Sequence, residues 1–204
     1  MESASFVSTE EIQLIWGKIL ANEFEEPGST PPNMIRVLSE ITPSLATTFR
    51  KICGMKVEMC PLREDRMIKN MEEEIIVPFN GHGEEFGRIG VSFEMLNELE
   101  TLGVIKFDGV GYVSVGIEAE EILLKVHNEM FLFSKDKKDT IPAGNVMLTS
   151  VGQALKKITL GENIPGYFDM VKRLFKANRI KCLENQKVEI VTEGDIWWVV
   201  ENVK

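Results

Sequence analysis

The two histidines have the most versatile side-chain chemistry in this sequence, but neither has the neighbours that catalysis or metal binding requires. His82 lies in the run Gly81-His82-Gly83-Glu84-Glu85, where an imidazole and two carboxylates are close in sequence. One short loop supplies too few fixed ligands for a metal, so a solvated turn explains this run. His127 falls on a predicted strand without a partner motif, and we expect a structural or surface role for it.

The other motifs that carry chemistry are missing or incomplete. The sequence has no GxSxG or SxxK segment for a serine nucleophile, and no Walker loop or GxGxxG segment for phosphates. Gly81, Gly83, Gly87 and Gly90 lack the lysine and the strand-loop-helix setting of a phosphate loop, so turns explain them. The acidic run at 72–74 is typical of a solvated face. We therefore predict that the chain is not an enzyme and has no catalytic residue, metal site or cofactor.

A series of basic residues near the C-terminus is the strongest candidate for a binding site. Residues 135–181 hold 10 basic and 4 acidic side chains, a net charge of +6. The candidate nucleic-acid contacts are Lys172, Arg173, Lys176, Arg179 and Lys181. Positions 172, 176 and 179 share one face of a helix, as side chains that contact phosphates do. The alternative is an ordinary solvated helix with Leu174 and Phe175 in the core.

Two neighbouring tryptophans, Trp197 and Trp198, lie on a predicted strand. Because successive side chains of a strand point to opposite faces, one is expected to pack inward and the other to be partly exposed. An exposed tryptophan is typical of protein interfaces. We therefore treat this pair as a candidate protein interface.

Composition limits the classes of protein that fit. The 204 residues are 44% hydrophobic and 27% charged, as in globular chains. No apolar run approaches the roughly 18 to 20 residues of a membrane span, and the first residues lack the pattern of a signal peptide. Cys53, Cys60 and Cys182 are an odd number without CxxC spacing, as expected for reduced thiols. These features predict a cytoplasmic protein without membrane contact.

Three helices with short links are predicted near the N-terminus, at 8–28, 34–41 and 43–54. The first begins at a capping box formed by Ser8 and Glu11, carries an apolar stripe that ends at Phe24, and stops at Pro27-Gly28. The second and third each follow a threonine and proline, which is a start signal for helices.

Strands and helices alternate in the rest of the chain. We predict strands at 56–60, 75–79, 121–133 and 146–148, helices at 150–158 and 165–178, and a C-terminal hairpin of 187–192 with 196–200. Residues 61–74 fit either a helix or a loop.

One further helix precedes a hairpin in the middle of the chain. Ser92 caps it, its buried face carries Phe93, Leu96 and Leu99, and Gly103 ends it. A strand at 104–107 then turns at Asp108-Gly109 and returns at 112–115. A helix followed by a hairpin is the layout of a winged-helix unit.

Together these elements predict an α+β fold. An N-terminal three-helix unit at 1–54 packs on a mixed helix and antiparallel-hairpin body at 55–204 with winged-helix-like features. The two regions form either two subdomains or one continuous domain.

Two stretches near the N-terminus, EEIQLIWGKILANEFEEPGS at 10–29 and MIRVLSEITPSLATTFRKIC at 34–53, resemble a known family. They are similar to the core of a bacterial family of domains of unknown function numbered 2806 (DUF2806). Farther along, LETLGVI at 99–105 and VMLTSVGQALKKI at 146–158 are similar to later elements of that family. The matching positions of the first two stretches are Ile12, Gln13, Trp16, Lys18, Leu20, Ala21, Glu23, Pro27, Gly28, Ser29, Leu38, Ile41, Ala46 and Phe49.

The resemblance implies a bacterial cytosolic protein and brings no known active site with it. The first helix is also distantly similar to abortive-infection alpha proteins, which implies a phage-defence setting. We predict a non-catalytic protein-interaction module whose partner is an unknown protein or a second copy of the chain. The alternative is nucleic-acid binding through the winged-helix-like body and the basic face at 172–181. Because the net charge is −9, that alternative requires a local basic face.

Overall fold

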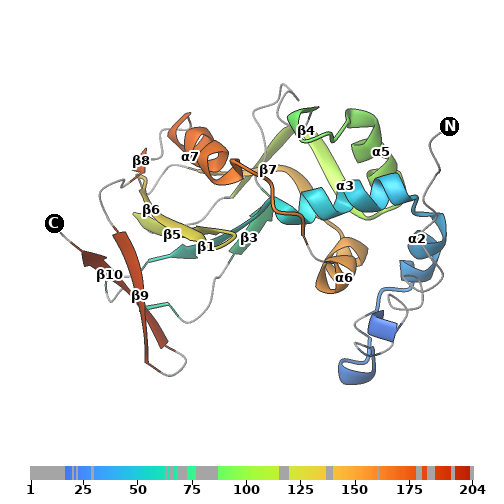
Figure 1. Cartoon of the computed structure of the whole chain (residues 1–204), viewed down its shortest axis with the longest axis horizontal. Helices are drawn as coiled ribbons and strands as arrows, with labels where there is room; N and C mark the ends of the chain where they lie inside the picture. The colour runs from blue at the N-terminus through green and yellow to red at the C-terminus, as the bar shows by residue number, and fades with distance from the viewer. Residues whose placement is uncertain are drawn as a thin grey trace. The chain divides into compact units, whose positions relative to one another are not determined.

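A computed structural model of the chain shows an α+β architecture of helices and antiparallel strands (Figure 1). The predicted fold class is therefore confirmed. The residues that the structure describes are 17–19, 21, 23–28, 30–62, 64, 67–68, 73–76, 87–114, 120–136, 140–159, 161–177, 181–182, 187–193 and 196–202. The predicted capping box at Ser8 and Glu11 lies outside them.

The chain forms two compact units, each built from segments that are distant in sequence. Unit 1 comprises 1–54, 86–107 and 147–162. Unit 2 comprises 55–85, 108–146 and 163–204.

Unit 1 is mainly helical. Of the first predicted helix, residues 17–19, 21 and 23–28 are described; 17–19, 21 and 23–25 are helical, and 26–28 form the bend and turn that end it. The helices that follow are α2 (Met34–Glu40), α3 (Pro43–Gly54), α5 (Phe93–Thr101) and α6 (Ser150–Ile158).

The starts of these helices follow local signals in the sequence. The hydroxyl oxygen of Thr42 accepts a hydrogen bond from the Leu45 amide before α3, as expected from its threonine and proline. Ser92 caps α5 and Thr149 caps α6 in the same way. At α2 the residue before the helix is Asn33, which makes no side-chain cap, so the predicted start signal at 29–32 is not used there.

The apolar stripes are buried in part. Leu45, Phe49 and Ile52 of α3 are buried, as their spacing predicts. Phe24, predicted on the stripe of the first helix, is 88% exposed. Ile35 of α2 is exposed as well, because the buried residues of that helix are Met34 and Val37.

The described strands form two antiparallel sheets. A seven-stranded sheet has the order β4-β7-β3-β1-β5-β6-β8, and a three-stranded sheet has the order β2-β10-β9. The bounds are β1 Lys56–Pro61, β2 Met67–Ile68, β3 Glu73–Ile76, β4 Ile105–Ser114, β5 Glu121–Val126, β6 Glu129–Ser134, β7 Ile141–Leu148, β8 Lys181–Cys182, β9 Lys187–Glu193 and β10 Ile196–Asn202. The predicted C-terminal hairpin is confirmed, since β9 pairs antiparallel with β10.

The long strand predicted at 121–133 is two strands. β5 and β6 pair antiparallel from Glu121 opposite Ser134 to Val126 opposite Glu129, and the chain reverses at His127 and Asn128. His127 has a φ of 54° and is exposed, so it lies in a turn and not on a strand as predicted. Because the residues on both sides of the turn are apolar, the sequence pattern predicted one continuous strand.

The hairpin predicted across Asp108-Gly109 does not form. β4 continues from Ile105 to Ser114 and has β7 as its neighbour in the sheet. The Asp108 carboxylate accepts from the Val110 amide at 2.8 Å, and the Asp108 carbonyl accepts from the side-chain amide of buried Asn145 at 2.7 Å. The turn residues thus produce a local irregularity inside one long strand.

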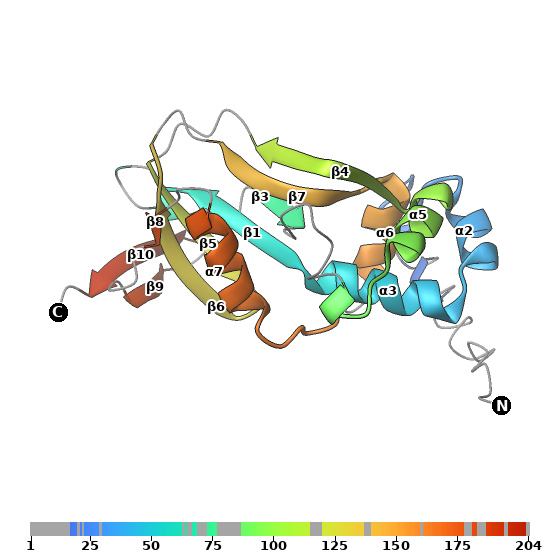
Figure 2. The same cartoon turned by 90° about the horizontal axis from the view of Figure 1, so that it is seen from above.

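In unit 2, helix α7 (Tyr167–Ala177) packs on the sheet. Figure 2 shows it beside β5 and β6. Two ring pairs join the helix to β6: Phe131 with Phe168, and Phe133 with Phe175. Val171 lies buried between these contacts along the helix. The predicted helix at 165–178 is therefore confirmed.

None of the described helices is both long and apolar enough to cross a bilayer.

Candidate functional site

The predicted basic face has three residues on α7, and one of them, Lys172, lies over two aromatic rings. The ammonium nitrogen of Lys172 lies 4.3 Å from the centre of the Phe168 ring and 5.5 Å from that of Phe131. Lys172 is half-buried. An ammonium above aromatic faces is stabilised in place, so this lysine helps to seat α7 on β6.

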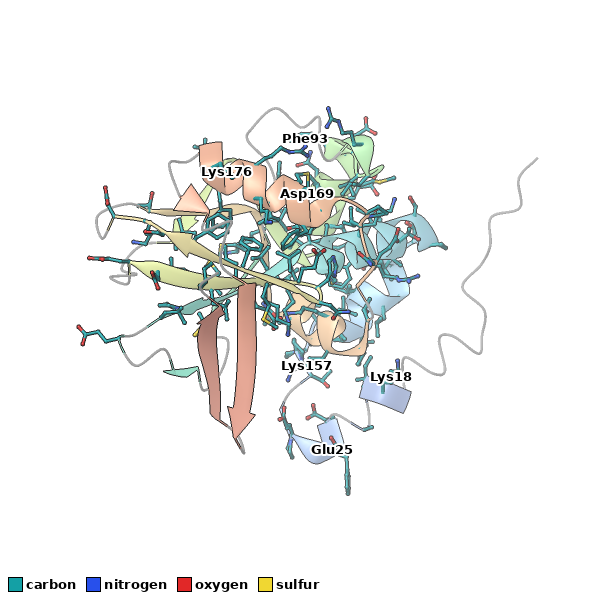
Figure 3. The ribbon with its side chains drawn as sticks, turned by 60° about the vertical axis from the view of Figure 1, so that its left-hand side comes forward. Lys18, Glu25, Phe93, Lys157, Asp169 and Lys176 are labelled. Carbon is teal, nitrogen blue, oxygen red and sulfur yellow. The ribbon has the colours of Figure 1, made fainter. Side chains whose placement is uncertain are left out.

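The solvent face of α7 carries charges of both signs. Arg173 and Lys176 are exposed, and so is Asp169, which lies four residues before Arg173. Figure 3 labels Asp169 and Lys176 on this helix. Residues three and four apart share a helix face, so a carboxylate interrupts the basic face that the sequence predicts.

For the other predicted site residues, the structure describes either no atoms or the backbone alone. Arg179 and His82 are not described, and neither are the side chains of Lys181, Trp197 and Trp198. The backbone register of β10 places Trp197 opposite Thr192 and Ile68, and Trp198 opposite Val191 and Met67.

A buried tyrosine that the sequence analysis did not identify anchors α7 at its first residue. The Tyr167 hydroxyl donates to the carbonyl oxygen of Met55, and the His127 ring lies edge-on with its centre 6.2 Å from the Tyr167 ring centre. Burial raises the pKa of Tyr167 well above its ordinary value. The spacing of Tyr167, Val171 and Phe175, each four residues apart, was the available signal.

A carboxylate between two lysines on the sheet has a structural explanation. Glu58 of β1 lies 2.9 Å from the Lys56 ammonium and 3.2 Å from that of Lys125, its cross-strand partner on β5. Burial raises the pKa of Glu58, but hydrogen bonds and Coulomb attraction from both lysines outweigh it, so the pKa lies below its ordinary value. The contact between Glu58 and Lys125 stabilises the pairing of β1 with β5.

In unit 1, α5 presents an aromatic pair to solvent. Phe93, predicted to be buried, is 64% exposed, and its ring meets that of Phe107 edge to face with the centres 5.5 Å apart. Glu94 and Glu98 are exposed on the same helix. We call Phe93, Phe107, Glu94 and Glu98 the α5 surface. Figure 3 labels Phe93 on this helix.

Several interactions within unit 1 fix α5 in place. Leu96 and Leu99 are buried, and the hydroxyl of Thr48 on α3 donates to the sulfur of Met95 at 3.1 Å. At the C-terminal end, a guanidinium nitrogen of Arg36 donates to the Leu102 carbonyl at 3.0 Å. Phe93 lies three residues before Leu96, on the side of the helix that is buried farther along, so its exposure follows from its place as the first residue of α5.

The first stretch that carries the family resemblance has a structural role at its end. The two carboxylate oxygens of Glu23 accept from the amides of Gly28 and Thr30, at 2.7 and 2.9 Å. Gly28 has a φ of +86°, which strongly favours glycine. Glu23, Pro27 and Gly28 therefore close the first helix and hold the loop after it.

The two later stretches that carry the resemblance, at 99–105 and 146–158, meet each other. The Thr149 hydroxyl caps α6 and donates to the Gly103 carbonyl at 2.6 Å. A Cβ on Gly152 would overlap the carbonyl oxygen of Val104, so only glycine permits this approach of α6. The residues that carry the resemblance are thus used to build unit 1.

No group of three or more His, Cys, Asp or Glu side chains among the described residues is placed to hold a metal ion. The candidate site is the α5 surface, a group of aromatic and acidic side chains on an α+β protein.

The family model for proteins of unknown function named DUF2806 matches residues 1–172. Since this match covers most of the 204 residues, the chain belongs to the DUF2806 family. No curated protein and no solved structure matches the chain.

Proposed function

We propose that this member of the DUF2806 family is a non-catalytic protein-interaction module that binds its partner through the α5 surface. The observation that supports the proposal is the 64% exposure of Phe93 beside Phe107 at the start of a helix that is held by its buried residues Leu96 and Leu99. Aromatic side chains are enriched in the cores of interfaces, and burial of the exposed part of a phenylalanine contributes roughly 1 to 2 kcal/mol.

The position of Phe93 suits a role as an anchor. It is the first residue of α5, next to the Ser92 cap, where the backbone is fixed by the hydrogen bond from the Met95 amide. A side chain on a fixed backbone loses little entropy on binding.

A tagged pull-down from bacterial lysate, with and without nuclease, tests the function. The wild-type chain is expected to retain a discrete protein that survives nuclease, and Phe93→Ser is expected to lose it. Phe24→Ser is the matched control, because Phe24 is 88% exposed on another helix. Retention of the same protein by Phe93→Ser would remove the α5 surface from the proposal.

The setting that we propose is the bacterial cytosol, with phage defence as the process. The likeness of the first helix to abortive-infection alpha proteins supports this setting. Plating efficiency of a phage panel on cells that express the chain is expected to fall, and Phe93→Ser is expected to restore it. Equal plating with and without the chain across the panel would argue against a defence role.

A second candidate function, nucleic-acid binding, rests on the exposed Arg173 and Lys176 of α7 and not on a winged-helix hairpin, since β4 is one continuous strand. The engagement of Lys172 and the presence of Asp169 on the same helix make it the weaker candidate. It predicts affinity for a duplex oligonucleotide that falls steeply with salt and disappears in Arg173→Glu with Lys176→Glu. Fluorescence anisotropy of a labelled duplex measures both effects.

A further inference from the structure

The two carboxylates of the α5 surface, on Glu94 and Glu98, do not together stabilise the helix that carries them. Glu94 lies in the first turn, where the helix macrodipole favours a carboxylate. Glu98 lies in the last turn, where the macrodipole disfavours a negative charge, and that turn contains no basic residue. Glu94 and Glu98 are also four residues apart, so they share a face and repel each other.

Three of the other charged groups described near α5 have partners or point elsewhere. The Glu100 carboxylate accepts from the Phe107 amide at 3.1 Å and joins α5 to β4. The Arg36 guanidinium donates to Glu40 at 2.7 Å as well as to the Leu102 carbonyl. Lys106 precedes Phe107 on β4, so it points to the opposite face of the strand.

From these observations we infer that the α5 surface binds a basic segment of a partner protein that carries an apolar side chain as its anchor. The inference rests on the proposed function and adds the chemistry of the partner. Lysine or arginine side chains of the segment lie against Glu94 and Glu98 and relieve their repulsion. The apolar anchor covers Phe93 and its partner ring.

Two other occupants fit this surface less well. A nucleic acid would place its phosphates against Glu94 and Glu98. A second copy of the chain in a two-fold contact would bring the same carboxylates of both copies together. Charge complementarity therefore favours a basic segment of a different protein.

Selection of a random peptide library, displayed on phage, against the immobilised full chain tests the inference. The enriched peptides are expected to contain an excess of lysine and arginine around an aliphatic or aromatic residue. Synthetic versions of them are then titrated against the chain and its variants by fluorescence polarisation.

The variants separate the two parts of the surface. Glu94→Lys with Glu98→Lys, and separately Phe93→Ser, are each expected to weaken binding about tenfold or more. Glu25→Lys with Glu129→Lys is the matched charge control, because both residues are exposed and lie outside the α5 surface. Phe24→Ser is the matched aromatic control, and both controls are expected to change binding about twofold or less.

Three results would overturn the inference: no enriched peptide, enriched peptides without a basic excess, or equal losses in the variants and their controls. Circular dichroism of each variant confirms that it is folded. If the pull-down partner is lost in Phe93→Ser but kept in Glu94→Lys with Glu98→Lys, the function stands and the charge inference fails. If Phe93→Ser keeps the partner, the function itself fails.

Discussion

Two aromatic groups in this protein contain the same residue type in opposite surroundings. In unit 2, Phe131, Phe133 and Phe175 are buried where α7 packs on β6. In unit 1, Phe93 and Phe107 form an edge-to-face pair, but Phe93 is largely exposed. The sequence pattern predicts that each of these rings makes a contact. Only the packing around a ring shows whether that contact lies in the core or on the surface.

We expect the largest effect on the free energy of unfolding among the buried rings of unit 2. Phe175→Ala should lower the free energy of unfolding by about 3 to 5 kcal/mol, because it removes a fully buried ring and leaves a cavity. Urea unfolding followed by circular dichroism measures the change. A loss below about 1 kcal/mol would mean that this ring is not part of a close-packed core.

Tyr167→Phe should lower the free energy of unfolding by about 1 to 2 kcal/mol at neutral pH, because the buried carbonyl of Met55 loses its donor. The raised pKa of Tyr167 adds a pH dependence. Its folded pKa lies above the unfolded value of about 10, so wild-type stability is complete below that pH and falls as the pH rises above it.

Urea unfolding of both proteins at neutral and at strongly alkaline pH tests this sign. The advantage of the wild type over Tyr167→Phe should shrink at the alkaline pH. A constant difference across this range would contradict the burial of the Tyr167 hydroxyl.

Lys172→Met keeps much of the side-chain volume and removes the charge above the two rings. It should lower the free energy of unfolding by about 0.5 to 1 kcal/mol, since a half-buried ammonium over aromatic faces contributes on that order. Arg173→Met is the control, and its effect should stay within about 0.5 kcal/mol, as for most surface changes. Equal effects would show that Lys172 is a solvated lysine.

We expect the smallest effect on the free energy of unfolding at the exposed pair of Phe93 and Phe107. Phe93→Ser should lower the free energy of unfolding by about 1 kcal/mol or less, because it removes one edge-to-face contact and little buried area. Thermal unfolding beside Phe175→Ala measures the contrast. A loss as large as that of Phe175→Ala would show that Phe93 stabilises the fold, and it would weaken its assignment as a binding residue.

Much of the secondary structure was predictable because its signals are local. The helices α3, α5, α6 and α7 and the hairpin of β9 with β10 were identified from caps, apolar spacing and turn residues. The candidate site was less predictable. Lys172 was expected to be available for phosphate, but rings from α7 and from β6, some forty residues earlier, lie beneath its ammonium.

Two predictions about turns were wrong, for different reasons. A turn signal at Asp108-Gly109 was overridden because β7 lies beside β4 and Asn145 binds the Asp108 carbonyl. A turn at His127 was missed because its flanks are apolar on both sides. In the first case, contacts with a distant strand outweighed a local turn signal; in the second, a local turn was concealed by apolar residues on both sides.

The sequence by itself determined the α+β class, most helix boundaries and membership of the DUF2806 family, because caps, periodicity and family motifs are written in consecutive residues. Only the tertiary structure decided that Phe93 is exposed while Phe175 is covered, and that Glu23 and Gly152 are used to build unit 1. The physical reason is that burial and hydrogen bonding depend on which segments meet, and this chain assembles each of its units from segments that are distant in sequence.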